Sequence, residues 1–157
     1  CLQFGRGAEY AIKRGSGKKL NLDEALTLSD RVEEDGLLHM WRNDASMVGN
    51  TSCQCCRDCC QNHAACDLNG VHIGRAYEKS RYEAYVDLEE CNGCQDCVDR
   101  CQFDAVEMFQ PAGSRKYKAA IDAAECWGCG ACVVGCATGA AKMRVARPPA
   151  HIPGAVG

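Results

Sequence analysis

Two identically spaced runs of four cysteines carry the clearest chemical signal in the sequence. Both have the pattern C-x2-C-x2-C-x3-C; they are Cys91, Cys94, Cys97 and Cys101, and Cys126, Cys129, Cys132 and Cys136. The iron atoms of iron–sulfur clusters take soft thiolates as protein ligands, and three thiols in consecutive C-x2-C steps can wrap around one four-iron cube. The spacing therefore predicts two 4Fe-4S clusters.

The similarity between the two runs extends beyond the cysteines. Residues 35 positions apart are identical at several other places, namely Ala84 and Ala119, Asp87 and Asp122, Glu90 and Glu125, Gly93 and Gly128, Val98 and Val133, Ala105 and Ala140, and Met108 and Met143. We interpret residues 85–144 as a duplicated two-cluster unit.

Residues 84–144 resemble the bacterial-type two-cluster ferredoxins. In that family the fourth cysteine of each run binds the other cluster. The resemblance therefore implies one cluster on Cys91, Cys94, Cys97 and Cys136, and a second on Cys126, Cys129, Cys132 and Cys101. The proline that usually follows the fourth cysteine is replaced by Gln102 and Ala137. Each replacement adds a backbone N–H near a cluster, and such groups help to set its potential.

Zinc and disulfides are the alternatives for so many cysteines. Structural zinc sites usually present two separated C-x2-C pairs rather than four ligands in one run. A disulfide scaffold would suit the cysteine density, but the total of 15 cysteines is odd. Iron–sulfur ligation explains the spacing better than either.

A second group of thiols lies upstream of the duplicated unit. Its six members are Cys53, Cys55, Cys56, Cys59, Cys60 and Cys66. Cys53, Cys56 and Cys59 repeat the C-x2-C-x2-C spacing, which predicts a third 4Fe-4S cluster. The fourth ligand is left open between Cys60, Cys66, Cys1 and His63. The spare thiols, with Cys1, could also belong to a fourth cluster, whereas a small zinc knuckle or unligated buried thiols are the plainer alternatives.

Local sequence signals predict an α+β fold with an N-terminal helical, cysteine-rich extension. Asn21 and Glu24 form a capping box that opens a helix, which ends at Gly36. The duplicated unit should contain short strands at 105–109 and 117–122, and a short helix after each cysteine triplet. Residues 1–19 are rich in glycine and are expected to be irregular.

These signals divide the chain into four parts. We expect a cysteine-rich region at 1–67, a connector at 68–84, the two-cluster domain at 85–144 and an extended proline-rich tail at 145–157.

Composition limits the function. The formal net charge is −3 with mixed signs, which argues against a nucleic-acid partner. No apolar run has the length of a membrane span, and no signal peptide is visible, although the chain begins at Cys1 rather than methionine. We therefore expect a reducing, cytoplasmic environment. No dinucleotide fingerprint or nucleophilic triad is present to suggest chemistry of the chain's own.

The order of motifs suggests the wider context. Gly36-Leu37-Leu38-His39, followed by the upstream thiols and the two-cluster unit, resembles a group of anaerobic iron–sulfur proteins that accompany larger oxidoreductases. This resemblance implies an electron-transfer subunit that serves a larger catalytic partner, for example one with flavin or metal. The alternatives are an iron–sulfur redox or gas sensor, and a subunit with an unusual catalytic cluster at Cys53–Cys66.

Overall fold

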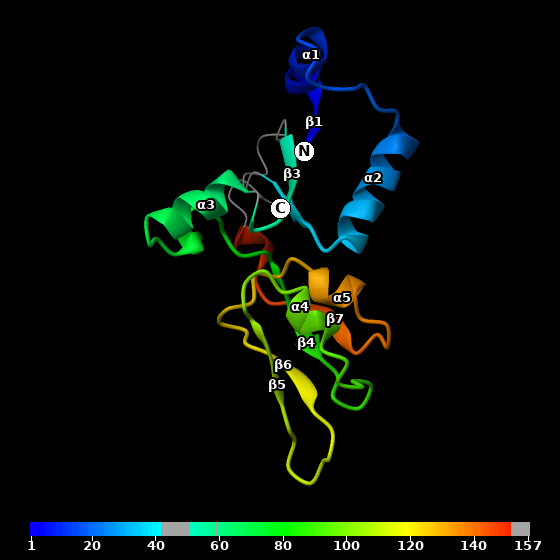
Figure 1. Ribbon diagram of the computed structural model, residues 1–157, viewed down its shortest axis with the longest axis vertical. Coiled ribbons are helices and arrows are strands. Elements are labelled where there is room, and N and C mark those ends of the chain that lie inside the picture. Colours follow the sequence, from blue (N-terminus) through cyan, green and yellow to red (C-terminus); the bar gives the residue numbers. More distant parts are fainter. Residues whose placement is uncertain (42–50, 59, 152–157) are drawn as a thin grey trace. The chain divides into compact units, whose positions relative to one another are not determined.

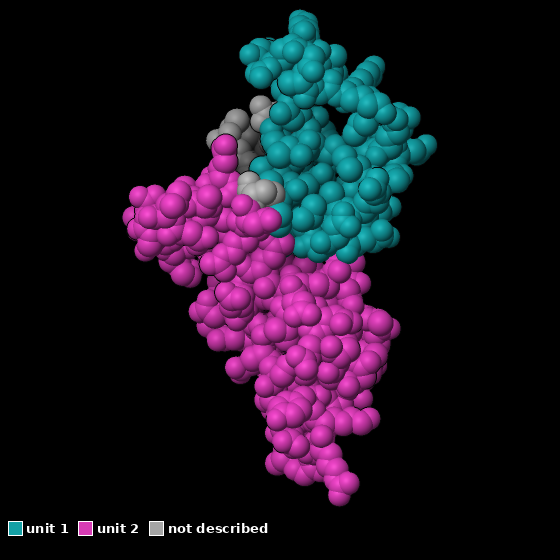
Figure 2. All heavy atoms as spheres, in the orientation of Figure 1, with its two compact units in different colours: residues 1–56, 149–157 teal, residues 57–148 magenta. Residues whose placement is uncertain are grey.

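The computed structural model describes residues 1–41, 51–58 and 60–151. The chain divides into two compact units (Figures 1 and 2): unit 1 comprises residues 1–56 and 149–157, and unit 2 comprises residues 57–148. Short helices and small separate sheets give a mixed α+β fold. Within the described residues, no helix combines the length and apolar character that crossing a membrane requires.

Unit 1 contains two helices and a three-stranded antiparallel sheet. The helices are α1 (Gly5–Lys13) and α2 (Leu22–Glu34), and the strands β1 (Leu2–Gln3), β3 (Thr51–Cys55) and β2 (Leu38–Met40) lie in that order. A short 3-10 helix, η2 (Pro149–His151), lies near the end of the described chain. The sheet places the first upstream thiols, because Cys53 and Cys55 are in β3 opposite Met40 and Leu38.

The predicted capping box of α2 is confirmed. The amide of Glu24 donates to the Asn21 side chain at 2.8 Å, and the amide of Asn21 donates to the Glu24 carboxylate at 2.9 Å. Gly36 has φ 74°, the left-handed conformation expected just after a helix. Two orphan amides at the start of the helix are thus satisfied by local sequence alone.

The expectation of an irregular segment at residues 1–19 is wrong, because α1 occupies its centre. Gly5, the first residue of the helix, and Gly15, two residues beyond its last, both have positive φ and mark its ends. Between them, Ala8–Lys13 contains good helix formers. No residue of α1 is buried, so this helix depends on propensity more than on packing.

Unit 2 contains the duplicated motif. Its elements are α3 (Gln61–Leu68), η1 (Ile73–Arg75), β4 (Tyr82–Val86), α4 (Asp96–Asp99), β5 (Val106–Phe109), β6 (Lys118–Ile121), α5 (Ala131–Val134) and β7 (Ala141–Val145). β4 pairs with β7 and β5 pairs with β6, both antiparallel. The predicted strands at 105–109 and 117–122 are therefore confirmed.

The short helices differ slightly from expectation. α4 begins at Asp96 and α5 at Ala131, so each includes the third cysteine of its run instead of following it. Gln95 and Gly130, immediately before the helices, both have left-handed backbone conformations, with φ 75° and 84°. The chain turns sharply there, which explains why helix formation starts inside the cysteine motif.

The core of unit 2 is built from small side chains and thiols. One buried cluster contains Ala84, Ala105, Cys126 and Cys132, and another contains Cys91, Val106, Ala119 and Ala140. Alanine and cysteine bury little apolar surface compared with leucine or phenylalanine. A core of this kind depends on bound metal for much of its stability.

Candidate metal centre

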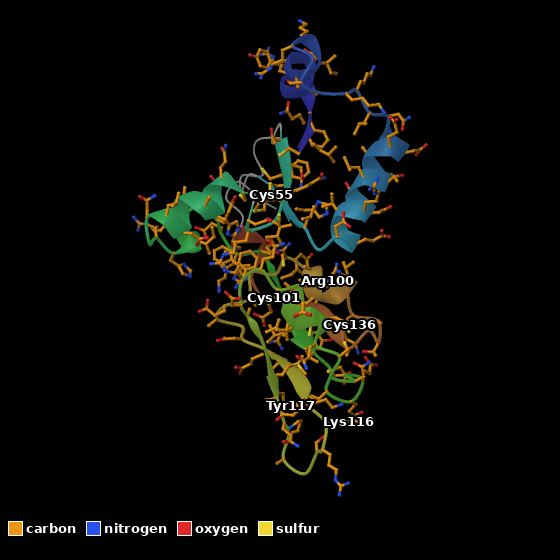
Figure 3. The ribbon with its side chains drawn as sticks, viewed as in Figure 1. Cys55, Arg100, Cys101, Lys116, Tyr117 and Cys136 are labelled. Carbon is orange, nitrogen blue, oxygen red and sulfur yellow. The ribbon has the colours of Figure 1, made fainter. Side chains whose placement is uncertain are left out.

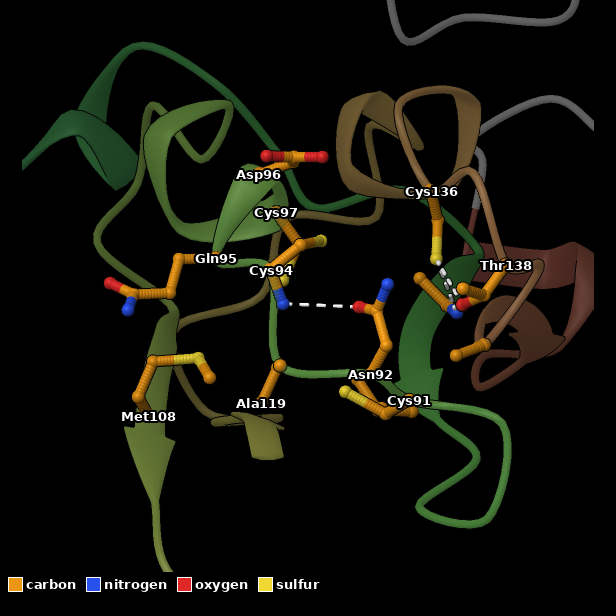
Figure 4. A pocket seen from close by; sticks show the side chains of 14 residues that line it. Cys91, Asn92, Cys94, Gln95, Asp96, Cys97, Met108, Ala119, Cys136 and Thr138 are labelled. Carbon is orange, nitrogen blue, oxygen red and sulfur yellow. Dashed lines mark hydrogen bonds between the residues drawn. The ribbon is translucent and has the colours of Figure 1, made fainter. Parts of the chain in front are cut away.

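Four thiols surround a cavity between the two halves of the duplicated motif (Figure 4). They belong to Cys91, Cys94, Cys97 and Cys136. The cavity encloses an empty volume of about 340 Å³, and β4, β5, β6 and β7 each contribute an apolar side chain to its wall: Val86, Met108, Ala119 and Ala141. We call it the first cavity.

A second cavity has an equivalent set of four thiols. Its cysteines are Cys101, Cys126, Cys129 and Cys132, and the empty volume is about 320 Å³. Phe103 and Trp127 contribute aromatic wall, and Ala105, Val106 and Ile121 contribute aliphatic wall.

Each cavity thus combines three cysteines of one run with the fourth cysteine of the other. Cys101 directly follows α4 and Cys136 directly follows α5 (Figure 3), with Arg100 and Gly135 closing the respective helices. This is the grouping that the ferredoxin resemblance implies. The binding of iron by each individual thiol stays a prediction.

Close backbone contacts fix the cysteine loops. Gly93 and Gly128, each one residue before the second cysteine of its run, have φ 80° and 69°. A Cβ atom would lie 2.4 Å from the Tyr117 carbonyl oxygen at Gly93, and 1.9 Å from the Tyr82 carbonyl oxygen at Gly128. Both values are far below van der Waals contact, so only glycine lets each loop approach the neighbouring chain segment.

Backbone amides point at several of the sulfur atoms. The amides of Ala105 and Ala141 donate to the Sγ atoms of Cys101 and Cys136, both at 3.3 Å, and the amide of Ala84 approaches Cys126 Sγ at 3.5 Å. Such donors stabilise negative charge on sulfur and orient the ligand. The protein therefore supplies the hydrogen bonds that a thiolate ligand needs.

Burial opposes ionisation of the thiols in the absence of metal. Desolvation raises the pKa of Cys132 to about 12, and it also raises the pKa of Cys97 and of Cys129. At Cys136 desolvation acts in the same direction, but hydrogen bonds from the Ala141 amide and Thr138 outweigh it, and the pKa is lowered. Cys97, Cys129 and Cys132 should therefore each release a proton when metal binds.

The residues suit a polynuclear cluster. The thiols stand around two cavities with largely apolar walls, and backbone N–H donors are aimed at three of the sulfur atoms. Soft ligands separated by an open volume are what a four-iron cube requires.

The upstream thiols are distributed over both units. Cys1, Cys53, Cys55 and Cys56 belong to unit 1, whereas Cys60 and Cys66 are buried in unit 2, and Cys59 lies outside the described residues. The third and fourth clusters therefore stay predictions.

Phe103 was not singled out by the sequence pattern. It follows the fourth cysteine of the first run by two residues, and its ring stacks on Trp127 with a centroid distance of 5.3 Å. The corresponding residue of the second run is Thr138. This break in the repeat was the only sequence signal for it.

The comparison with known protein families bears on the same segment. Residues 90–140 match the family model described as a 4Fe-4S dicluster domain. No curated protein matches the chain. The matched segment contains all eight cysteines that line the two cavities. Residues 90–140 are therefore a 4Fe-4S ferredoxin-type unit, which gives the chain an iron–sulfur electron-transfer role.

Proposed function

We propose that this chain is the electron-transfer subunit of a larger oxidoreductase and relays single electrons to or from a catalytic partner. The pair of thiol-lined cavities carries the proposal, because each offers four soft ligands in a largely apolar wall. A bound four-iron cluster supplies reversible one-electron chemistry. The partner supplies the reaction itself.

The chain's own residues have three tasks in this function. The cysteines hold iron in the two sets that line the cavities. The amides of Ala84, Ala105 and Ala141 stabilise negative charge on sulfur. The aliphatic and aromatic walls exclude water and lower the local dielectric, which shifts the potential of each centre.

A third cluster that uses the upstream thiols belongs to the same proposal. The C-x2-C-x2-C spacing of Cys53, Cys56 and Cys59 supports it. Three clusters in a chain of this size favour a fixed conduit over a freely diffusing carrier. We propose that the protein functions in a reducing, anaerobic cytoplasm.

Metal analysis of the full chain, isolated without oxygen, tests the cluster number. Three cubes require about twelve irons and about twelve sulfides per chain, and two cubes require about eight of each. Truncation before Leu68 should remove one third of both and leave a two-cluster electron paramagnetic resonance (EPR) spectrum. An iron count near eight per chain, with one equivalent of zinc, would show that the upstream thiols form a zinc knuckle and not a third cluster.

The mass of the native protein tests whether the chain is a subunit of a larger complex. A chain isolated from its source should run with larger subunits on size exclusion, and mass spectrometry should identify them as components of a redox enzyme. A chain that ran alone as a monomer would contradict the subunit proposal while leaving the iron count unaffected.

A further inference from the structure

One arginine side chain joins the two halves of the duplicated unit. The Nε atom of Arg100 donates a hydrogen bond to the Ala131 carbonyl oxygen at 3.0 Å, and the same side chain lies against Gly135. Arg100 closes α4, whereas Ala131 opens α5 and Gly135 closes it. The two short helices, which carry cysteines of different runs, are therefore held together by Arg100.

The presence of glycine at position 135 is explained by this arginine. Gly135 has φ −81°, a conformation that any residue adopts, so its backbone does not require glycine. A Cβ atom at this position would instead lie 2.2 Å from Cδ and 2.4 Å from Nε of Arg100. Both distances are far below van der Waals contact. The absence of a side chain at Gly135 therefore leaves the space that Arg100 occupies.

Arg100 and Gly135 are equivalent positions of the repeat. They are 35 residues apart, which is the spacing that relates the two cysteine runs. One half of the unit thus has a long basic side chain where the other half has no side chain. At this junction the two halves are complementary instead of identical, and the junction accommodates a single arginine.

The junction is adjacent to the two cysteines that cross between the halves. Arg100 precedes Cys101, which lines the second cavity, and Gly135 precedes Cys136, which lines the first (Figure 3). Arg100 is half-buried and lines neither of these cavities. Its side chain therefore lies beside both ligand sets without being a ligand of either.

A positive charge at this junction acts on both clusters. An electron on one cluster repels an electron on the other, and an opposite charge near both of them offsets this repulsion. A guanidinium group remains protonated in proteins, and partial burial limits the screening of its charge by salt. Among the residues of α4, α5 and their C-caps, all of which the structure describes, Arg100 is the one basic side chain.

We propose that Arg100 couples the two clusters: its side chain fixes the junction where the ligand sets meet, and its charge stabilises the state in which both clusters are reduced. Arg100 is a positioning residue for electron transfer. Each cluster gains one electron from the reductant, which loses it, and the arginine is neither oxidised nor reduced. This inference rests on the proposed function, because it requires two clusters that accept and pass on electrons.

Redox titration with EPR detection tests this role in the full-length protein, isolated anaerobically and reduced with dithionite. Arg100→Met removes the charge but keeps an unbranched side chain against Gly135. We expect the midpoint potentials of both clusters to fall, because their reduced states lose a nearby positive charge. Arg100→Lys keeps the charge and should restore most of this difference. Iron content should equal that of the wild type in both variants.

Arg115 provides a matched control. It is exposed in the turn between β5 and β6, so solvent and salt screen its charge. Arg115→Met makes the same chemical change in the same unit, and both midpoint potentials should fall less than in Arg100→Met. Equal shifts in the two variants would overturn the proposal. A shift of the second cluster alone would also overturn it, because Arg100 would then act only through Cys101.

Gly135→Ala is the reciprocal test. The added Cβ displaces the Arg100 side chain, while the arginine itself and the eight thiols of the two cavities are retained. We expect lower midpoint potentials again, because the charge moves away from the junction, and an altered magnetic interaction between the two reduced clusters in the EPR spectrum. If Arg100→Met lost iron, this variant would decide. Lowered potentials with full iron content would support the proposal, and unchanged potentials would overturn it.

Failure of the proposed function gives a different result. About four irons per chain would show that a single cube is bound, and the basis for coupling would be absent before any titration. A chain that ran alone on size exclusion would refute the partner, but the potentials would still respond to Arg100→Met. Eight or more irons with potentials insensitive to Arg100→Met would refute the role of Arg100 alone.

Discussion

The two cavities are lined by equivalent sets of four cysteines, yet their surroundings differ. Polar side chains share the wall of the first cavity, namely Asn92, Gln95, Asp96 and Thr138. At the second cavity Phe103 and Trp127 are present, and Gly130 replaces Gln95 at the equivalent position. Duplication of a ligand motif therefore does not duplicate the environment of the metal.

The contrast extends to the sulfur atoms. Among the equivalent thiols, burial differs at one position: Cys132 of the second cavity is buried, whereas Cys97 of the first is only partly buried. Burial raises the pKa of both thiols, and it raises the pKa of Cys132 to about 12. Since a drier environment disfavours added negative charge, the second-cavity cluster should have the lower potential.

Removal of a single cysteine ligand is expected to change the difference between the two clusters most. Cys97→Ser replaces a soft ligand of the first cavity by a harder, poorer one. We expect loss of up to about four irons, because one cube is damaged, while the second cluster stays reducible. EPR of the reduced protein should show one of the two ferredoxin-type signals lost or altered. If both signals persisted unchanged, the ligand sets would be wrong.

Adding a side chain at a loop glycine should have the next largest effect on the two clusters. Gly128→Ala places a Cβ against the Tyr82 carbonyl at the second cavity. The left-handed backbone alone costs an alanine about 1–2 kcal/mol, and the contact adds to this cost. Thermal unfolding of the holoprotein should show a lower midpoint and earlier loss of the second cluster.

Gly113→Ala is the matched control for this change. Gly113 also has positive φ, at 78°, but a Cβ there meets nothing within 4 Å. The difference in midpoint between the two variants isolates the close approach from the backbone strain. Equal midpoints would show that the loop can move away from Tyr82.

A smaller effect is expected when the aromatic wall is opened. Trp127→Leu should leave the iron content unchanged but admit water to the second cavity, which stabilises the more negative, reduced cluster. The potential of that cluster should rise by on the order of tens of millivolts, toward the value of the first. Redox titration with EPR detection measures the change. An unchanged titration would make Trp127 a plain packing residue.

The smallest effect is expected at the first cavity. The Thr138 hydroxyl lies 3.6 Å from Cys136 Sγ and contributes to the lowered pKa of that thiol. Thr138→Val removes this weak interaction at nearly constant volume, so the potential of the first cluster should fall by less than the Trp127 effect. The second cluster is the internal control. A rise in the first potential would show that the hydroxyl does not stabilise the reduced state.

Sequence alone determined the features that depend on local rules. Ligand type and spacing identify the iron–sulfur unit, because only a tight loop of thiols can surround a cube. The capping box at Asn21 and Glu24 and the short strands on either side of Pro111 follow from equally local preferences. Local rules failed at α1, where glycine suggested a loop although the residues between favour a helix.

Only the tertiary structure decided which environment each set of thiols receives. The pairing of β4 with β7 joins segments nearly sixty residues apart and places Val86 and Ala141 in the wall of the first cavity. The ring contacts of Phe103 with His63 and Trp127 likewise join α3, the loop at Phe103 and the cysteine loop at Trp127. Such contacts carry no periodic signal in the sequence, because they arise from packing between distant segments. For that reason the ligands could be predicted, while the difference between the two cavities could not.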